Sequence, residues 1–335
     1  MKYLKGIGII TIILLILTSC GKEEGESNNQ KLAGIDTIIN KDINIIISQD
    51  LSNRITLYPK PIDDTDIINS ILEMYYPSIY KSEGRVIGQK DRISMLFMNS
   101  IIIKKNNIDM KKLNIDLSSF SNEERIKYLT NKTDDGNSYK MDKKDFLEEV
   151  WKINNSAKKT PSGADIRYLF ESGLNELSVI KNPENKISFG KTIVNEKRNI
   201  LILLTDGYME SGSVAKSSVK NKYYYLTKKV VNDFRKAFLA SGESDIKDFF
   251  KANGYGIIPV KNSNLENLEV LAVEFYDRSI AKSGSTRIIP RDYEILKLFW
   301  EDWMNKSGLK RFVVYETFSS KSSFEAALKK FINSK

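Results

Sequence analysis

Two stretches decide the fold: Ile43-Asn44-Ile45-Ile46-Ile47-Ser48-Gln49-Asp50-Leu51-Ser52 and Asn199-Ile200-Leu201-Ile202-Leu203-Leu204-Thr205-Asp206-Gly207. Each is an apolar run typical of a strand that is buried on both faces of a sheet, and each leads into an aspartate. Ligands of open parallel sheets bind at the carboxyl ends of the strands. If the two strands are neighbours, Asp50, Ser52 and Asp206 converge there, in an oxygen-rich site of the kind that holds Mg²⁺.

Strand and helix patterns alternate outward from these two runs. This order predicts an α/β fold, a doubly wound and mostly parallel sheet flanked by helices, in one domain with insertions over residues 41–335. We expect strands at 43–48, 92–99, 101–103, 199–204, 268–276 and 311–315, with the short one at 101–103 turning back at an edge. We expect helices from 64 to Pro77 and at 142–153, 166–179, 222–240, 245–251, 292–305 and 324–332, and an irregular stretch at 113–137.

The amino-terminal residues have the pattern of a targeting segment. A basic start precedes the apolar stretch from Gly6 to Leu17, and Leu17-Thr18-Ser19-Cys20 closes it. This resembles a bacterial lipoprotein signal, which implies cleavage after residue 19 and lipidation of Cys20, the only cysteine. Residues 20–40 then form a flexible linker. The acidic residues after Lys22 look like a surface-export signal, so we expect a lipid-anchored protein of the cell envelope, on the outer membrane or the cell surface.

The composition excludes several kinds of site. The chain contains no histidine, which removes the usual zinc sites, the imidazole-dependent triads and the commonest general base. The net charge is +9, but the lysines are scattered among acids. A nucleic-acid interface would instead present a basic stripe with stacking aromatic residues, so we expect no nucleic-acid partner.

The order of elements, with Asp50-x-Ser52 after the first strand and Thr205-Asp206-Gly207 after a central one, resembles the von Willebrand factor A (VWA) domain. The resemblance implies a metal-ion-dependent adhesion site at the carboxyl edge of the sheet. Its aspartate and first serine correspond to Asp50 and Ser52, and its last aspartate to Asp206. Arg54 stands at the second serine position. Ala164, before Asp165, stands at the threonine position, which Thr160 fills only if the loop is remodelled.

Two positions of Arg54 remain open at this stage. Its guanidinium either bridges Asp50 and Asp206 in place of a cation, or it points to solvent and leaves a weak Mg²⁺ site. We favour the degenerate site without metal, because two neutral oxygen ligands are missing. Asp277-Arg278 follows another strand at the same edge, where we expect a surface ion pair.

These features predict a binding module rather than an enzyme. We expect a membrane-anchored lipoprotein whose VWA-like domain binds a protein or glycan through the edge of its sheet. One alternative is a metal-dependent envelope hydrolase that uses Asp50 and Asp206. Another is a structural scaffold within an envelope complex.

Overall fold

The computed structural model describes residues 37–57, 60–82, 84–85, 88–133, 136–161, 164–182, 186–188, 191–210, 219–280 and 288–334. The expected signal peptide at 1–19, Cys20 and most of the expected linker lie outside these residues. The first strand begins at Thr37, which is earlier than the domain start that we expected at residue 41.

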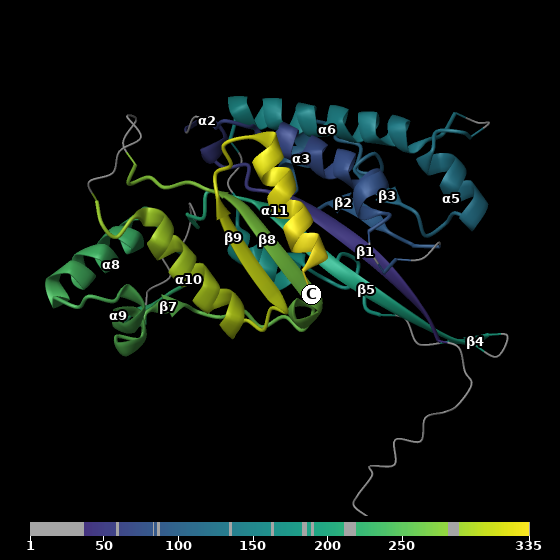
Figure 1. The fold of residues 1–335 in the computed structure, drawn as a ribbon. Coiled ribbons are helices and arrows are strands. Elements are labelled where there is room, and N and C mark those ends of the chain that lie inside the picture. The colour runs from purple at the N-terminus through teal and green to yellow at the C-terminus, as the bar shows by residue number, and fades with distance from the viewer. Residues whose placement is uncertain are drawn as a thin grey trace, which may run out of the picture.

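A mostly parallel sheet forms the centre of the molecule (Figure 1). Its strands are β1 (Thr37–Gln49), β2 (Arg92–Met95), β3 (Asn114–Asp116), β4 (Lys186–Ser188), β5 (Lys191–Leu204), β8 (Leu268–Phe275) and β9 (Arg311–Glu316). They lie in the order β3-β2-β1-β5-β8-β9, and β4 pairs with β5. Only β3 and β4 run antiparallel to their neighbours. A separate short pair joins β6 (Lys222–Tyr223) and β7 (Gly256–Ile257).

Helices cover both faces of this sheet (Figure 1). One face carries α3 (Asp64–Met74), α4 (Ile101–Lys105), α5 (Asn122–Leu129), α6 (Tyr139–Lys159) and α11 (Lys321–Asn333). The other face carries α7 (Ile166–Tyr168), α8 (Lys228–Ser241), α9 (Ile246–Ala252) and α10 (Asp292–Lys306). Short turns complete the chain: α2 (Arg54–Leu57), η1 (Tyr75–Ile79), η2 (Leu169–Gly173) and η3 (Leu265–Asn267).

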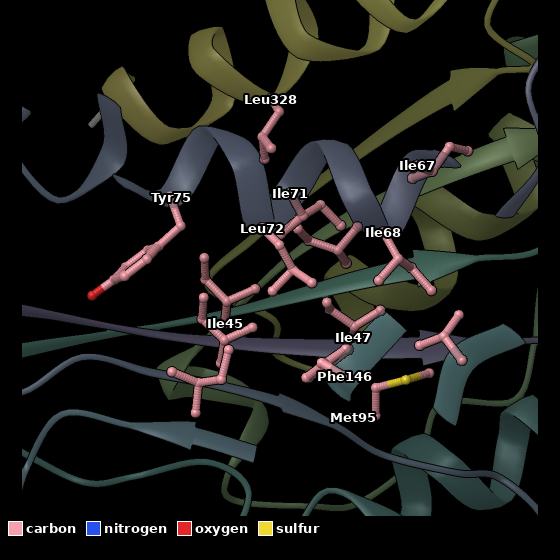
Figure 2. Packing of buried hydrophobic residues seen from close by; sticks show 14 of the residues in the cluster. Ile45, Ile47, Ile67, Ile68, Ile71, Leu72, Tyr75, Met95, Phe146 and Leu328 are labelled. Carbon is pink, nitrogen blue, oxygen red and sulfur yellow. The ribbon is translucent and has the colours of Figure 1, made fainter. Parts of the chain in front are cut away.

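Alternation along the central strands creates two separate cores. In β1, Ile45 and Ile47 pack on the α3 and α6 side, whereas Ile46 packs on the opposite side. Figure 2 shows the first of these cores, where Ile71 of α3 and Phe146 of α6 pack with the β1 isoleucines. Successive side chains of a strand point to opposite faces, so an unbroken isoleucine run is what a strand covered on both faces requires.

The α/β sheet flanked by helices is therefore confirmed, with local differences. The expected strand at 101–103 is the helix α4, and the expected irregular stretch contains β3 and α5. The expected helix at 166–179 is only the short α7 and the π-helical turn η2. Ser121 opens α5 with a reciprocal capping box to Glu124, a local signal that the sequence contained.

Candidate functional site

The carboxyl ends of β1 and β5 meet at one edge of the sheet. The two strands pair in parallel up to Gln49 opposite Leu204, and the amide of Asp50 then donates to the carbonyl of Leu204 at 2.8 Å. Asp50 and Asp206 consequently leave the sheet side by side. This brings together the two aspartates that the sequence pattern pointed to, and we call this edge the rim.

Asp50 is buried, and its carboxylate is held by local donors. One oxygen accepts the amide of Ser52 at 2.9 Å, and the other accepts the hydroxyl of Thr205 at 3.3 Å. Burial raises the pKa of Asp50, and the nearby Asp206 raises it further, while the guanidinium of Arg54 acts in the opposite direction. Asp50 is therefore an acceptor for turn and strand-end donors, enclosed within the protein.

Arg54 occupies neither of the two positions that we considered. It is only 1% exposed, so it does not point to solvent. Its Nη2 and Nη1 donate to the two carboxylate oxygens of Asp64 at 2.5 and 3.3 Å, and its Nε donates to the backbone carbonyl of Asp50 at 2.7 Å. It lies 3.8 Å from the Asp50 carboxylate and does not bridge it to Asp206. The planar guanidinium of arginine can donate two hydrogen bonds to a single carboxylate, and Asp64 at the start of α3 accepts both.

Asp64 is the anchor of this buried ion network. Burial alone would raise the pKa of Asp64, but the charges of Arg54 and Lys60 hold it well below its usual range. Lys60 approaches the second oxygen of Asp64 at 2.6 Å. The side-chain amide Nε2 of Gln49 also donates to Asp64, at 3.1 Å. Sequence reasoning treated Asp64 as a helix-opening residue, and only the packing of α2 against α3 reveals its partner.

Arg278 is the residue that pairs with Asp206, and the sequence reasoning missed this role. Its Nη2 lies 2.7 Å from Asp206, its Nη1 lies 3.2 Å from Glu210, and its guanidinium stacks 3.8 Å from the ring centre of Tyr208. We expected a surface ion pair, yet the Arg278 side chain is mostly buried. Its position directly after β8, at the same edge as Asp206, was the available signal.

Glu274 is a second residue that the sequence reasoning missed. It is 1% exposed, and one of its carboxylate oxygens has no partner among the described residues. Burial raises the pKa of Glu274 to about 7, with Asp64 adding to the effect and the charges of Lys60 and Arg54 opposing it. Its backbone has φ of +72°, where the register of β8 against β9 shifts. Such bulges re-aim side chains and occur often next to functional sites.

The residues at and beside the family's threonine position have other roles. Asp165 caps α7 by accepting the amide of Tyr168 at 2.9 Å. Ala164 packs against the second core, and the exposed Thr160 ends α6. Within the described residues, no hydrogen bond or ion pair joins them to Asp50 or Asp206. Ser162 and Gly163 lie outside those residues.

Two arginines lie beside the carboxylates at the rim. A hard cation needs several oxygen ligands with free lone pairs, but Arg278 occupies one oxygen of Asp206 and Arg54 adds a positive charge beside Asp50. In the part of the chain that the structure describes, no group of three or more acidic, histidine or cysteine side chains is placed to hold a metal ion.

Comparison with known proteins does not identify a family for the chain. No protein-family model and no curated protein matches the chain. Among solved structures, the chain is similar to the pilus adhesin SpaC from Lactobacillus rhamnosus GG, with a TM-score of 0.33 and 12% identity. The match covers 89% of this chain and 31% of the adhesin, and a likeness at this level carries no argument about function. Among the described helices, none has both the length and the apolar character that crossing a bilayer requires.

Proposed function

We propose that the chain is a VWA-like interaction module that binds a protein or glycan partner through its rim. The observation that carries this proposal is the convergence of Asp50, Ser52 and Asp206 at the carboxyl edge of the sheet. The mostly parallel sheet flanked by helices also agrees with such a domain. Asn53 and Glu210 are exposed polar residues beside this convergence. We expect the partner to contact Asn53, since Glu210 already pairs with Arg278.

In this proposal, the rim binds its partner without a tightly bound metal ion. Arg278 and Arg54 supply the positive charge that a cation would otherwise bring to Asp206 and Asp50. We expect calorimetric titration of the protein with Mg²⁺ to give no saturable heat. Saturable binding that Asp50→Ala abolishes would overturn this part of the proposal and restore a cation site.

A hydrolase that uses Asp50 and Asp206 fits the same residues less well. The raised pKa of Asp50 is a feature of many acid–base sites. However, Asp50 is 2% exposed, and both of its oxygens already accept hydrogen bonds from Ser52 and Thr205. A reacting group therefore has little access to the Asp50 carboxylate, so we favour binding over catalysis.

Partner binding at the rim can be tested by site-specific photo-cross-linking in living cells. A photoreactive residue at Asn53 should give a discrete adduct, because Asn53 is exposed between Ser52 and α2. Glu266 is also exposed but lies at the amino end of β8, on the opposite edge of the sheet, and the same probe there is the matched control. Adducts only at Glu266, or none at either position, would contradict rim binding and favour the scaffold alternative.

We also propose that Cys20 carries lipid and anchors the module to the cell envelope, on the outer membrane or the cell surface. The support is the sequence pattern that ends at Cys20. Wild-type protein should partition into the detergent phase and incorporate a labelled fatty acid, and Cys20→Ser should do neither. Equal partitioning of the two forms would remove the anchor from the proposal without affecting the rim.

A further inference from the structure

Helix α6 exposes a large aromatic side chain on its outer face. Trp151 is 62% exposed, whereas the other two tryptophans, Trp300 and Trp303, are fully buried. The inner face of the same helix is fully buried, as Phe146 and Val150 show. Figure 1 shows α6 along the outer edge of the molecule, beside α3. Trp151 therefore plays no part in the core, and its exposure requires another explanation.

A hollow lies on each side of Trp151. The first has a volume of about 770 Å³ and lies between α3 and α6, where Thr65 and Asn69 form one wall. The second, of about 670 Å³, continues toward the carboxyl end of α6. The apolar side chains of the first hollow are Met141, which is 49% exposed, Leu147 and Trp151. We call the two hollows together the α6 groove.

Lysines surround this apolar strip. The groove is lined by Lys140, Lys143, Lys144, Lys152, Lys158 and Lys159, against one acidic residue, Glu148. Three of these lysines lie near acids: Lys143 near Glu73 at 3.8 Å, Lys144 near Glu148 at 3.7 Å and Lys152 near Glu149 at 2.6 Å. Within the described ranges, the other three have no acid at ion-pair distance. The groove therefore carries a net positive charge around an apolar centre.

We propose that the α6 groove binds an acidic polypeptide segment that inserts an apolar side chain beside Trp151. The lysines at the border of the groove are complementary to carboxylates of the bound segment. The apolar strip of Met141, Leu147 and Trp151 is suited to an aliphatic or aromatic side chain of that segment. The first hollow lies between α3 and α6, and such a surface is what an amphipathic segment occupies in helix-in-groove recognition. This surface is independent of the rim.

Trp151 also provides the measurement. Because Trp300 and Trp303 are buried, the tryptophan emission that iodide can quench comes from Trp151. The probe is a synthetic amphipathic peptide of about the length of α6, with glutamates on one face and leucines on the other. We expect it to protect Trp151 from iodide, with an affinity that falls as salt is raised. A peptide of the same composition in scrambled order should protect less.

Variants separate the groove from general charge effects, with affinities measured by calorimetry. Trp151→Ala and the pair Lys158→Glu with Lys159→Glu should each weaken peptide binding by about tenfold or more. Lys236→Glu, at an exposed lysine of α8, is the matched control and should leave it unchanged, as should Glu210→Arg at the rim. Circular dichroism checks that each variant is folded.

Three results would overturn the proposal. The first is the absence of Trp151 protection by the peptide at low salt. The second is binding that neither Trp151→Ala nor the lysine reversals weaken. The third is protection by anionic phosphatidylglycerol vesicles or by a polyuronate that is stronger than protection by the peptide, which would assign the groove to a membrane surface or an acidic glycan.

Discussion

At the scale of single residues, charge inside the protein decides the character of the rim. Arg54, Lys60 and Asp64 form a buried network, and Glu274 lies within the electrostatic reach of all three. A buried ion is tolerated only when its charge and its hydrogen-bonding capacity are matched. The charge of Asp64 is matched by its partners, and its pKa is low. In contrast, one carboxylate oxygen of Glu274 has no hydrogen-bond partner in the described part of the chain, and the pKa of Glu274 is raised.

Glu274 should therefore make stability depend on pH. Its pKa is about 7 in the folded protein against an ordinary value of 4.5, so the folded state binds the proton more tightly than the unfolded state. The resulting stabilisation is complete below pH 4.5 and is lost as the pH rises through 7. The side chain introduced by Glu274→Gln has no charge at any pH. This variant should therefore not show the loss of about 3 kcal/mol in the free energy of unfolding that the wild type shows by pH 9.

Urea unfolding of the wild type and of Glu274→Gln at several pH values between roughly 5 and 9 checks this expectation. This range extends roughly two pH units to either side of the Glu274 pKa. The free energy of unfolding of wild type should fall across the range relative to that of Glu274→Gln. Glu243→Gln, at an exposed glutamate, is the control and should follow wild type. Parallel pH profiles for wild type and Glu274→Gln would show that Glu274 is not the titrating group.

At the scale of elements, the bulge of β8 shapes the edge of the sheet. Leu271 and Val273 face the first core and Ala272 faces the second, yet Phe275 also faces the second. The left-handed Glu274 and the register shift against β9 reverse the alternation at this point. Phe275 is thereby turned toward the turn that follows β5, where Gly207 has φ of +85°.

Gly207→Ala should be strongly destabilising for two reasons. A Cβ at this position would lie 2.8 Å from Cδ2 and 2.9 Å from Cε2 of Phe275, and the backbone is left-handed. We expect a loss of about 2–4 kcal/mol in the free energy of unfolding. Gly242→Ala is the matched control, because Gly242 has φ of +74° with open space around it, and should cost only about 1 kcal/mol. Equal losses for the two variants would mean that Phe275 makes no close contact with Gly207.

At the scale of the whole molecule, one sheet supports two cores. β1, β5 and β8 each contribute side chains to both cores. Unfolding of the sheet would therefore disrupt the two cores together. The helices α3, α6 and α11 belong to one core, and α8, α9 and α10 to the other. We therefore expect one cooperative unfolding transition. Substitutions in the two cores should change the free energy of unfolding independently of each other.

Ile71→Val in the first core and Ile295→Val in the second test this independence. Both residues are fully buried, and each change should cost about 1 kcal/mol. The double variant should cost the sum to within about 0.5 kcal/mol, because the sheet separates the two sites. Chemical denaturation followed by fluorescence and by circular dichroism should report one transition. Two separated transitions would contradict the shared sheet as a single cooperative unit.

The sequence determined the α/β class and the central strands, because apolar runs buried on both faces predict strands inside a parallel sheet and such strands end at one side of it. It predicted the convergence of Asp50 and Asp206 only on the condition that the two strands are neighbours, and the structure meets that condition. Local rules failed at residues 101–103, where three consecutive isoleucines suggest a strand although only Ile102 is buried in α4.

Tertiary structure alone decided which charges meet. The sequence placed Arg54 near Asp50, but whether its guanidinium would reach Asp50, Asp206 or solvent depended on the position of α3, which brings Asp64 to it. Arg278 likewise reaches Asp206 only because β8 lies beside β5. Ion pairing depends on distances of a few ångströms between segments that are far apart in the chain. Hydrophobic periodicity along the chain does not determine those distances.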